Sequence, residues 1–464
     1  MDQDKIVSAL SEISGEDNVS TSLFTRINSA LDGLPYDLEK EQIPFAVVRP
    51  KDTEEISRIL KLANTEKFPV VIRGAGTGIH GGTRPKRGGV VLDTTRLDSV
   101  EILEEYGYCE AGAGVYCSPL NDKLSDMGYY FPVLPGSERV ATIGAVVSIN
   151  MSGHSVDAYQ GKPENYVLGL EVVLPTGEVL WTGSKTLRKP AGPDLTRLFI
   201  GTEGLLGVIT KVRFRLVPLP KYFKRVFIVF GTIYEAAECT VDMYLKKAPY
   251  PFSLEIMSEN CAKPAFEAVG LPDPGGAVYL LVVDGRYEDE VGHKVERMLE
   301  IVREHKPEKI EVIEDEARWG RIWYARQQIL PVLCSKGPSI AEICDPSLAN
   351  LPDAIREVEE IPKRLGTIRN LDVYIYGHIG APSFHPHFIL PTGLPADVKR
   401  EAIREIRAKI AEVNLKLGCS YGEQGIFPER KEFFLKKYGD KAYELLLELK
   451  RVFDPNDILN PGNL

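Results

Sequence analysis

Arg73-Gly-Ala-Gly-Thr-Gly-Ile-His-Gly-Gly82 is the stretch of sequence that decides the fold. Its five glycines directly follow the apolar, strand-like run VVI at residues 70–72. Glycine lets the chain turn tightly and leaves main-chain N–H groups uncovered, so that several of them can converge on a pyrophosphate. Glycines after a strand are also typical of a plain tight turn. By itself, therefore, the segment leaves a phosphate site and a tight turn both open.

The residues on either side of this loop predict a β-α-β arrangement. The run PFAVVRPKDTEEISRILKLANTEKFPVVI at residues 44–72 indicates a strand, a helix with an acidic first turn and a second strand that ends in the glycines. The next element, VVLDTTRL at residues 90–97, has the pattern of another strand. The loop is therefore not the G-x-G-x-x-G fingerprint of a nicotinamide-binding domain, in which the glycines open a helix.

Farther along the chain the pattern predicts α+β organisation with a change at about residue 220. Short strands separated by Gly and Pro continue to that point, after an amphipathic segment over residues 1–40. Longer strands and helices then alternate, as in FKRVFIVFG at 223–231, AVYLLVVDG at 277–285 and the helical GHKVERMLEIVREH at 292–305. This alternation favours a second domain built on an antiparallel sheet. The run KAYELLLELKRVF at 441–453 predicts a closing helix.

Composition excludes several classes of function. The net charge of -10 argues against a nucleic-acid surface, which requires a basic stripe. No window is apolar enough to span a membrane and the acidic start is unlike a secretory signal, so we expect a cytoplasmic protein, compatible at most with peripheral membrane association. The seven cysteines lack cluster spacing, which predicts no iron-sulfur or structural zinc centre within the chain.

Two further segments resemble the first loop in character, and together they point to a family. Pro135-Gly-Ser137 with Ala141-Thr-Ile-Gly144, and Gly201-Thr-Glu-Gly-Leu-Leu-Gly-Val-Ile209, each place small residues and a hydroxyl between strands. With RGAGTG, VLGLEVVLPTGEVLWTG and LTRLFIGTEGLLGVIT, they resemble in order and spacing the FAD domain of the vanillyl-alcohol oxidase superfamily. The nearest branch contains the GlcD subunit of glycolate oxidase, D-lactate dehydrogenase and D-2-hydroxyglutarate dehydrogenase.

The resemblance implies an α+β protein with a two-part FAD-binding domain of the PCMH type, an antiparallel-sheet cap domain and a C-terminal helical segment. The corresponding ranges are 1–40 for the N-terminal segment, 41–220 for the FAD domain, 221–420 for the cap, and 421–464 for a segment that packs back on the FAD domain. The residues that it implies as FAD contacts are Arg73, Gly74, Ala75, Gly76, Thr77, Gly78, Pro135, Gly136, Ser137, Thr142, Gly144, Glu203, Gly204 and Ile209.

Three of the seven histidines fall within ten residues, in Gly377-His-Ile-Gly-Ala-Pro-Ser-Phe-His-Pro-His387. Their density suggests a metal, but the spacing is no standard zinc pattern, and polar caps on a strand-turn explain it as well. The resemblance assigns His378, His385 and Glu423 as ligands of a divalent ion such as Zn, Mn or Fe, which could grip a 2-hydroxy acid and lower the pKa of its hydroxyl.

The chain departs from the family pattern beside this cluster. Ala381-Pro-Ser383 replaces an Asp-Gly-Asn run, and Gln424 replaces the histidine that relatives use as general base. An amide is not a base near neutral pH, so the proton must go elsewhere, and His387 is the nearest candidate in the sequence. The segment WGRIWYAR at 319–326 resembles a family motif whose arginine pairs a substrate carboxylate, here Arg326. A solvated helix face is the alternative for Arg326.

Two functions follow from these features. The first is a dehydrogenase that oxidises a small 2-hydroxy acid, of D-lactate or glycolate type, by hydride transfer to flavin N5. Because the chain has no cluster motif, we expect its electrons to pass to an iron-sulfur or electron-transfer flavoprotein partner subunit, or to a quinone. The second is an FAD-holding relay subunit of a larger redox complex, whose substrate site has degenerated around Gln424.

Overall fold

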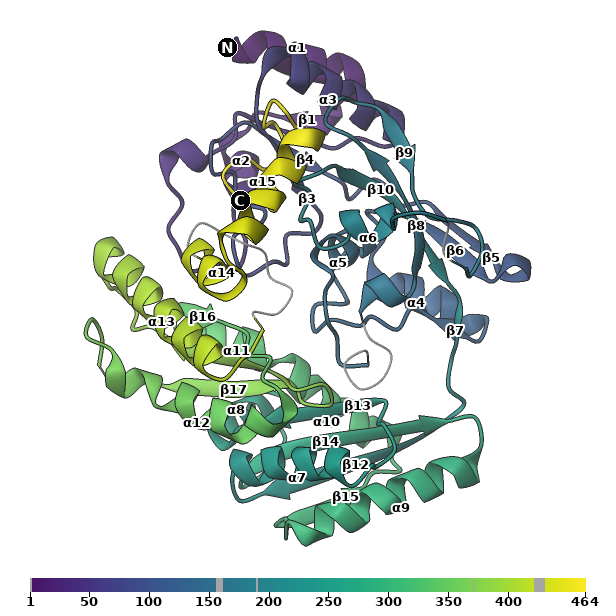
Figure 1. Cartoon of the computed structure of the whole chain (residues 1–464), viewed down its shortest axis with the longest axis vertical. Coiled ribbons are helices and arrows are strands. Elements are labelled where there is room, and N and C mark those ends of the chain that lie inside the picture. The colour runs from purple at the N-terminus through teal and green to yellow at the C-terminus, as the bar shows by residue number, and fades with distance from the viewer. Residues whose placement is uncertain (1, 156–161, 189–190, 370, 421–429) are drawn as a thin grey trace. The chain divides into compact units, whose positions relative to one another are not determined.

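The computed structural model describes residues 2–155, 162–188, 191–369, 371–420 and 430–464. The chain divides into two compact units. Unit 1 comprises residues 1–152, 162–219 and 423–464, and unit 2 comprises residues 153–161 and 220–422. Unit 1 thus combines segments from both ends of the sequence, which Figure 1 shows in purple and in yellow. The short 153–161 segment belongs to unit 2 although it lies within the sequence of unit 1.

Unit 1 contains a small sheet of order β1-β2-β4-β3. Its strands are β1 (Val19–Ser20), β2 (Ala46–Val48), β4 (Val90–Asp93) and β3 (Val70–Arg73), of which β2, β4 and β3 are parallel. Helix α3 (Thr53–Glu66) crosses from β2 to β3 and is capped by Asp52, whose side chain accepts from the Glu55 N–H. The predicted strand, helix and strand before the glycine loop are therefore confirmed. Val47, Val71 and Val91 pack together on the sheet.

A second sheet of unit 1 is antiparallel and has the order β5-β6-β10-β8-β9. Its strands are β5 (Val100–Leu103), β6 (Tyr108–Gly112), β10 (Val208–Arg215), β8 (Val167–Val173) and β9 (Val179–Trp181). A two-stranded ribbon pairs β11 (Val217–Pro218) with β7 (Tyr129–Tyr130). The helices of this unit are α1 (Gln3–Ser14), α2 (Leu23–Ala30), α4 (Cys117–Asp126), α5 (Ile143–Ile149), α6 (Leu195–Phe199), α14 (Lys431–Tyr438) and α15 (Asp440–Phe453).

Unit 2 is built on one antiparallel sheet of order β15-β12-β14-β13-β17-β18-β16. The strands are β12 (Tyr222–Phe230), β13 (Ser253–Met257), β14 (Ala277–Gly285), β15 (Lys309–Val312), β16 (Ser339–Ala341), β17 (Val373–His378) and β18 (Ser383–Ile389). The predicted strands at 223–231 and 277–285 are confirmed as β12 and β14, and the α+β class is confirmed as well. Every residue of β14 is buried, as expected for a strand covered on both faces.

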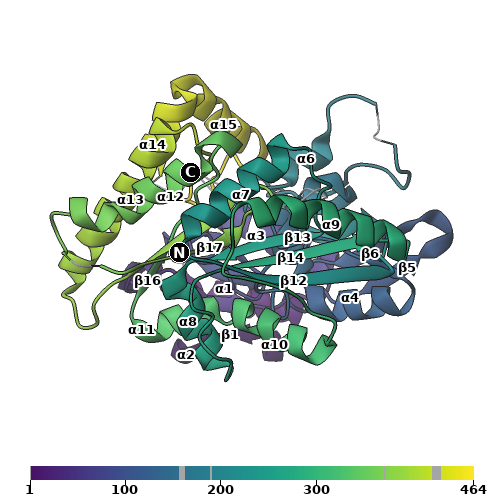
Figure 2. The same ribbon diagram turned by 90° about the horizontal axis from the view of Figure 1, so that it is seen from below.

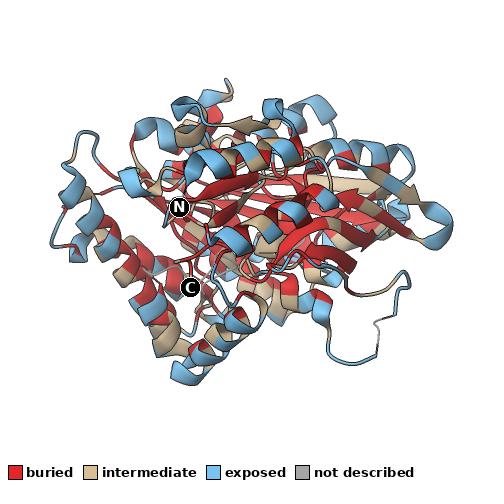
Figure 3. Cartoon of the chain, turned by 90° about the horizontal axis from the view of Figure 1, so that it is seen from above, coloured by how far each residue is buried: buried red, intermediate tan, exposed pale blue. Residues whose placement is uncertain are grey.

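Helices cover both faces of this sheet. Figure 2 shows α7 (Ile233–Leu245) and α9 (Glu288–Glu304) on one face, and α8 (Glu259–Ala268), α10 (Glu316–Gln327) and α11 (Ile329–Lys336) on the other. Helices α12 (Leu351–Glu359) and α13 (Ala396–Lys416) complete the unit. Buried residues concentrate on the strands and on the inward sides of the helices (Figure 3). No helix in the described part of the chain is long and apolar enough to cross a membrane.

Candidate functional site

Unit 1 contains a cavity where the glycine loop after β3, helix α5 and the turn before β10 come together. Eight of the predicted cofactor residues line it: Gly74, Gly76, Thr77, Gly78, Gly144, Glu203, Gly204 and Ile209. The other six predicted residues are not among its lining: Arg73, Ala75, Pro135, Gly136, Ser137 and Thr142. His80 of the same loop lines the cavity too. Ile72, Gly82, Thr94 and Ser148 are further lining residues, and the sequence did not single them out for this role.

Arg73 fills the space behind the glycine loop. It donates from Nη1 to the carbonyl of Leu31 at 2.7 Å. Burial lowers the pKa of this guanidinium, while Asp32 and Asp93 act in the opposite direction. Gly76 has φ +72°, and a Cβ there would lie 1.9 Å from the Arg73 Nη2 atom. Only glycine therefore suits this position, because it accepts the left-handed backbone and leaves room for the arginine.

A buried ion pair ties the glycine loop to the N-terminal part of the chain. Asp32 accepts from Arg84 Nε at 2.7 Å and from the Gly81 N–H at 2.8 Å. Both side chains are almost fully buried, with exposed fractions of 0% for Asp32 and 2% for Arg84. Arg84 also donates to the carbonyls of Leu34 and Tyr36. The end of the glycine loop at Gly81 is thus held by the segment around Asp32. The sequence of the loop itself does not predict this contact.

Thr142 lies against the beginning of the same loop. Its side chain is 0% exposed, and its Oγ1 atom has no hydrogen-bond partner among the described residues. A Cβ on Gly74 would come within 2.4 Å of this oxygen. A buried hydroxyl without a partner carries a desolvation cost. This hydroxyl lies against Gly74, which lines the cavity, although Thr142 itself does not.

Unit 2 has a second polar centre, built around Glu255 on β13. Its carboxylate is completely buried. One oxygen, Oε1, lies 2.7 Å from His378 Nδ1, and the other, Oε2, accepts from Arg326 at 2.7 Å (Nε) and 2.5 Å (Nη2). Burial by itself would raise the pKa of Glu255, but Arg326 and His378 outweigh it and lower the pKa to about 2. Glu255 is therefore a carboxylate that joins two predicted site residues.

Arg326 is held in place with part of its guanidinium uncommitted. Its Nε and Nη2 atoms point to Glu255, while Nη1 donates to no residue that the structure describes. Its Cζ atom lies 4.6 Å from the centre of the Tyr376 ring, a cation–π contact. The side chain is 8% exposed, which contradicts the alternative of a solvated helix face. The Nη1–Nη2 edge has the geometry to bind a carboxylate with two parallel hydrogen bonds.

The strand register places the clustered histidines on one face of the sheet. On β17 and β18, Tyr376 pairs with His385 and Tyr374 pairs with His387. Paired residues of antiparallel strands share a face. On β13, Glu255 pairs with His378, which brings the carboxylate to the same place. The ring centres of His378 and His385 are 5.3 Å apart.

His387 is fully enclosed in this cluster. Its ring stacks on Tyr376 at 4.9 Å, and its Nδ1 lies 2.9 Å from Ser339 Oγ. Its Nε2 has no partner among the described residues. Burial is the main cause that lowers the pKa of His387 to about 3. A general base that works near neutral pH needs a pKa near that pH, so this environment disfavours His387 as the proton acceptor.

Glu255 and His154 belong to this centre, but the sequence did not predict them as site residues. Glu255 lies in the apolar strand SLEIM, where a lone charged residue in a buried strand was the available signal. His154 comes from the 153–161 segment and packs edge-on against Trp323 of α10, with ring centres 4.9 Å apart. Burial lowers its pKa to about 3. Nothing in the local sequence connects His154 with a strand that begins about a hundred residues later.

The predicted metal site is only partly within the described residues. His378 and His385 lie together, whereas Glu423 and Gln424 fall outside the described residues. In the described part of the chain, no group of three or more His, Cys, Asp or Glu side chains is placed to hold a metal ion. The contact between His378 Nδ1 and Glu255 leaves Nε2 as the nitrogen that could bind a metal, with the carboxylate orienting the ring.

Comparisons with known proteins match both halves of the chain. Residues 44–183 match the family described as FAD binding domain, and residues 219–464 match the family described as FAD linked oxidases, C-terminal domain. The chain is 30% identical over 460 residues to the glycolate oxidase subunit GlcD of Bacillus subtilis, covering 98% of this chain and 95% of that protein. It is 31% identical to a D-lactate dehydrogenase of Archaeoglobus fulgidus, covering 90% of this chain and 91% of that protein.

Among solved structures, p-cresol methylhydroxylase with substrate bound has a similar fold. The TM-score is 0.80 at 18% identity, covering 99% of this chain and 96% of that one. At this identity the likeness concerns the fold alone. Together the comparisons confirm the superfamily resemblance, the PCMH-type fold and FAD as the cofactor.

The cavity of unit 1 fits an FAD molecule on structural grounds. Glycines of three segments supply uncovered main chain at its wall, among them Gly74, Gly144 and Gly204. A Cβ built on Gly78 would meet no atom within 4 Å. Gly78 has no steric reason within the described chain to be glycine, so the space beside it is available to the pyrophosphate or a neighbouring part of the cofactor.

We expect Gly78→Ala to weaken FAD binding without weakening the fold, because the new methyl group enters space that only the cofactor would occupy. The Kd for FAD, measured by fluorescence titration of the cofactor-free chain, should rise by about 10-fold or more. The unfolding midpoint of the cofactor-free chain should not fall, since Ala in place of Gly reduces the entropy of the unfolded state. Gly292→Ala on α9, where a Cβ also meets nothing within 4 Å, is the matched control. An unchanged Kd in Gly78→Ala would count against this cavity as the FAD site.

Glu255→Gln should destabilise unit 2 because it leaves Arg326 as a buried, unpaired cation. Breaking a buried pair by removing one partner typically costs about 3–5 kcal/mol. Glu311→Gln is the control, since Glu311 pairs with Arg318 on the surface and such pairs contribute about 0–1 kcal/mol. Urea unfolding followed by tryptophan fluorescence compares the two variants. Equal losses in both would show that Glu255 has no special structural role.

Proposed function

The chain belongs to the family of FAD-linked oxidases, and we propose that it is a dehydrogenase that oxidises a small 2-hydroxy acid to the 2-oxo acid. The observation that carries this proposal is the arrangement of Arg326 in unit 2. Glu255 fixes its Nε and Nη2 atoms and leaves the Nη1–Nη2 edge for a substrate carboxylate. The names of the relatives support the substrate class, because glycolate and D-lactate are both 2-hydroxy acids.

The remaining side chains of the centre suit the hydroxyl end of such a substrate. His378 shares the Glu255 carboxylate with Arg326, and Glu255 orients the His378 ring through Nδ1. The His385 ring lies beside that of His378. With Glu423, which lies outside the described residues, they would bind a divalent ion that lowers the pKa of the substrate hydroxyl. Aromatic side chains pack around the centre, since Trp323 lies edge-on to His154 and Tyr376 lies under Arg326.

Oxidation of the acid removes a hydride and a proton. Bound FAD would supply the acceptor for the hydride from C2 and for its two electrons, at flavin N5. The hydroxyl proton also needs an acceptor, and Gln424 cannot be that acceptor, because an amide is not a base near neutral pH. Burial lowers the pKa of His387 and of His154 to about 3, so neither histidine suits this role and we propose that another group takes the proton.

The electrons then need an acceptor outside the chain. The seven cysteines have no cluster spacing, and the glycine loop is followed by a strand where a nicotinamide-binding domain has a helix. We therefore propose an iron-sulfur or electron-transfer flavoprotein partner subunit, or a quinone, in a cytoplasmic complex. The relative from Bacillus subtilis is itself named as a subunit, which supports a partner.

Anaerobic titration with a panel of D- and L-2-hydroxy acids tests the proposed activity. We expect one acid to bleach the flavin absorbance of the purified chain rapidly, because hydride transfer reduces the flavin. Nicotinamide cofactors should neither reduce nor reoxidise it. If no acid bleaches the flavin while dithionite still does, the chain is a relay subunit with a degenerate substrate site.

Metal analysis tests the proposed role of the histidines. We expect the purified chain to retain a divalent ion and His378→Ala or His385→Ala to lose it, because each removes a ligand. His305→Ala is the matched control, since His305 pairs with Asp242 away from the site. The FAD absorbance should remain in all three variants. A wild-type chain that binds no divalent ion after dialysis against Zn²⁺, Mn²⁺ or Fe²⁺ would exclude the metal.

A further inference from the structure

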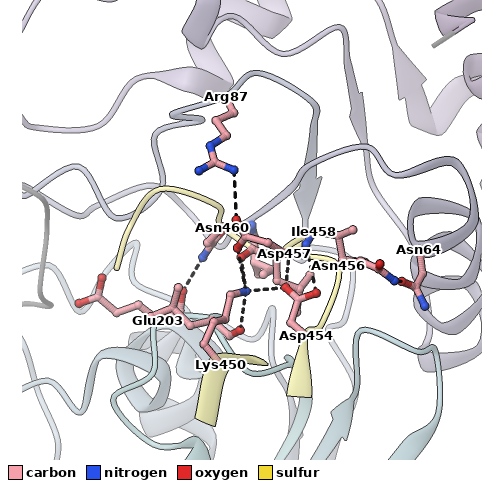
Figure 4. A network of polar contacts seen from close by, with 12 residues as sticks. Asn64, Arg87, Glu203, Lys450, Asp454, Asn456, Asp457, Ile458 and Asn460 are labelled. Carbon is pink, nitrogen blue, oxygen red and sulfur yellow. Dashed lines mark hydrogen bonds and ion pairs between the residues drawn. The ribbon is translucent and has the colours of Figure 1, made fainter. Parts of the chain in front are cut away.

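The segment 454–463 after helix α15 is folded around a buried lysine. Lys450 donates to the carbonyls of Leu205 and Leu459 at 3.0 and 2.8 Å, and to Asp454 Oδ2 at 2.5 Å (Figure 4). An ammonium group has three donors, so each of them is used. The Lys450 side chain is 9% exposed and the Asp454 side chain 0%. A buried pair with all its hydrogen bonds made fixes the geometry around it, because any departure leaves a charge unsatisfied.

Asp454 transmits this geometry to the rest of the segment. Its carboxylate accepts from the N–H groups of Ile458 and Leu459 at 3.1 and 2.8 Å. The segment then pairs with the edge of β3, where the Val70 N–H donates to Ile458 O and the Asn460 N–H donates to Val70 O. Strand β3 leads directly into the glycine loop. The 454–463 segment therefore contacts the strand that leads into the cavity lining of unit 1.

Asn460 joins two walls of that cavity. Its Oδ1 accepts from the Ile72 N–H at 3.2 Å. Its Nδ2 donates to the Glu203 carbonyl at 2.5 Å (Figure 4). Asn463 makes a third connection, from Nδ2 to the Gly82 carbonyl at 3.2 Å. Ile72, Gly82 and Glu203 all line the cavity, whereas neither asparagine does. Both asparagines are buried.

The wall that Asn460 holds has an unfavourable backbone. Glu203 has φ +51° and Gly204 has φ +75°. A left-handed conformation costs free energy for a residue with a Cβ, and such conformations persist only where the surroundings impose them. Two hydrogen bonds of the Glu203 backbone contribute here. The Asn460 Nδ2 donates to the Glu203 carbonyl at 2.5 Å, and the Glu203 N–H donates to the Ser148 carbonyl at 3.0 Å. Without Asn460, the first of these hydrogen bonds is lost.

We propose that Asn460 and Asn463, set by the buried Lys450–Asp454 pair, form a cofactor clamp that determines how tightly the chain holds FAD. They are positioning residues, because they act through the backbone of the cavity wall and do not line the cavity. The clamp concerns the cofactor and is independent of the proposed substrate. Because coupling between two equilibria is reciprocal, bound FAD must also tighten the 454–463 segment.

Three variants of the cofactor-free chain test the clamp by fluorescence titration with FAD. Asn460→Ala removes both side-chain bonds, and Asn460→Asp keeps an acceptor for Ile72 but loses the donor to Glu203. Both should raise the Kd for FAD by about 10-fold or more. Asn456→Ala is the matched control, since Asn456 lies in the same segment, is exposed and bonds only Asn64 among the described residues. Its Kd should stay within about 2-fold of wild type.

Urea unfolding and hydrogen exchange separate this role from general stability. Titrations are made at a urea concentration and temperature at which each cofactor-free variant is folded, so that global unfolding does not enter the Kd. In the wild-type chain, added FAD should slow exchange of the Ile458, Leu459 and Asn460 amides. Unchanged affinity in both Asn460 variants, or FAD that leaves these amides unprotected, would overturn the proposal. If Asn460→Ala does not fold, Asn463→Ala and the wild-type exchange measurement decide.

Discussion

A glycine loop that presents bare main chain to a ligand has no side chains with which to hold its own shape, and the cofactor cavity depends on this constraint. The necessary side chains come from elsewhere in unit 1. Asp32 and Arg84 hold the far end of the loop, and Asn460 holds strand β3, which leads into it. Arg73 fills the space that the absent side chain of Gly76 leaves. The shape of this short loop therefore depends on residues near the beginning of the chain and on residues near its end.

The same feature recurs in three polar centres of the described residues, namely a buried carboxylate with hydrogen bonds to both of its oxygens. Asp454 organises the turn after α15, Asp32 organises the glycine loop, and Glu255 organises the side chains of unit 2. A buried charge is costly unless it is paired and hydrogen-bonded, so each carboxylate admits few alternative arrangements of its neighbours. Rigidity of this kind suits a flavoprotein, since groups that bind a cofactor or a substrate act best when they are already in position.

The fold itself leaves the chemistry open. The structural neighbour with the similar fold is named p-cresol methylhydroxylase, whereas the relatives in sequence are named for glycolate and D-lactate. Proteins of one architecture thus carry different activities, and function must be argued from the site. In this chain Arg326, Glu255 and the clustered histidines form the site on which the proposed oxidation of a 2-hydroxy acid depends.

The sequence by itself determined the class of fold, the cofactor and many of the residues near it. Strands β2, β3, β12 and β14 follow from apolar periodicity, and the glycine loop after β3 follows from composition, because these signals are local. Only the tertiary structure brought Asn460 to Ile72 and Glu203, and Glu255 to Arg326 and His378. These contacts join residues far apart in the chain, and no periodicity or motif records which distant strand or turn will lie beside another. The folded environment decided the rest. Burial lowers the pKa of His387 and makes it a poor base, whereas Arg326 and His378 keep Glu255 a carboxylate against the effect of its burial. Both pKa values depend on surroundings that exist only after folding.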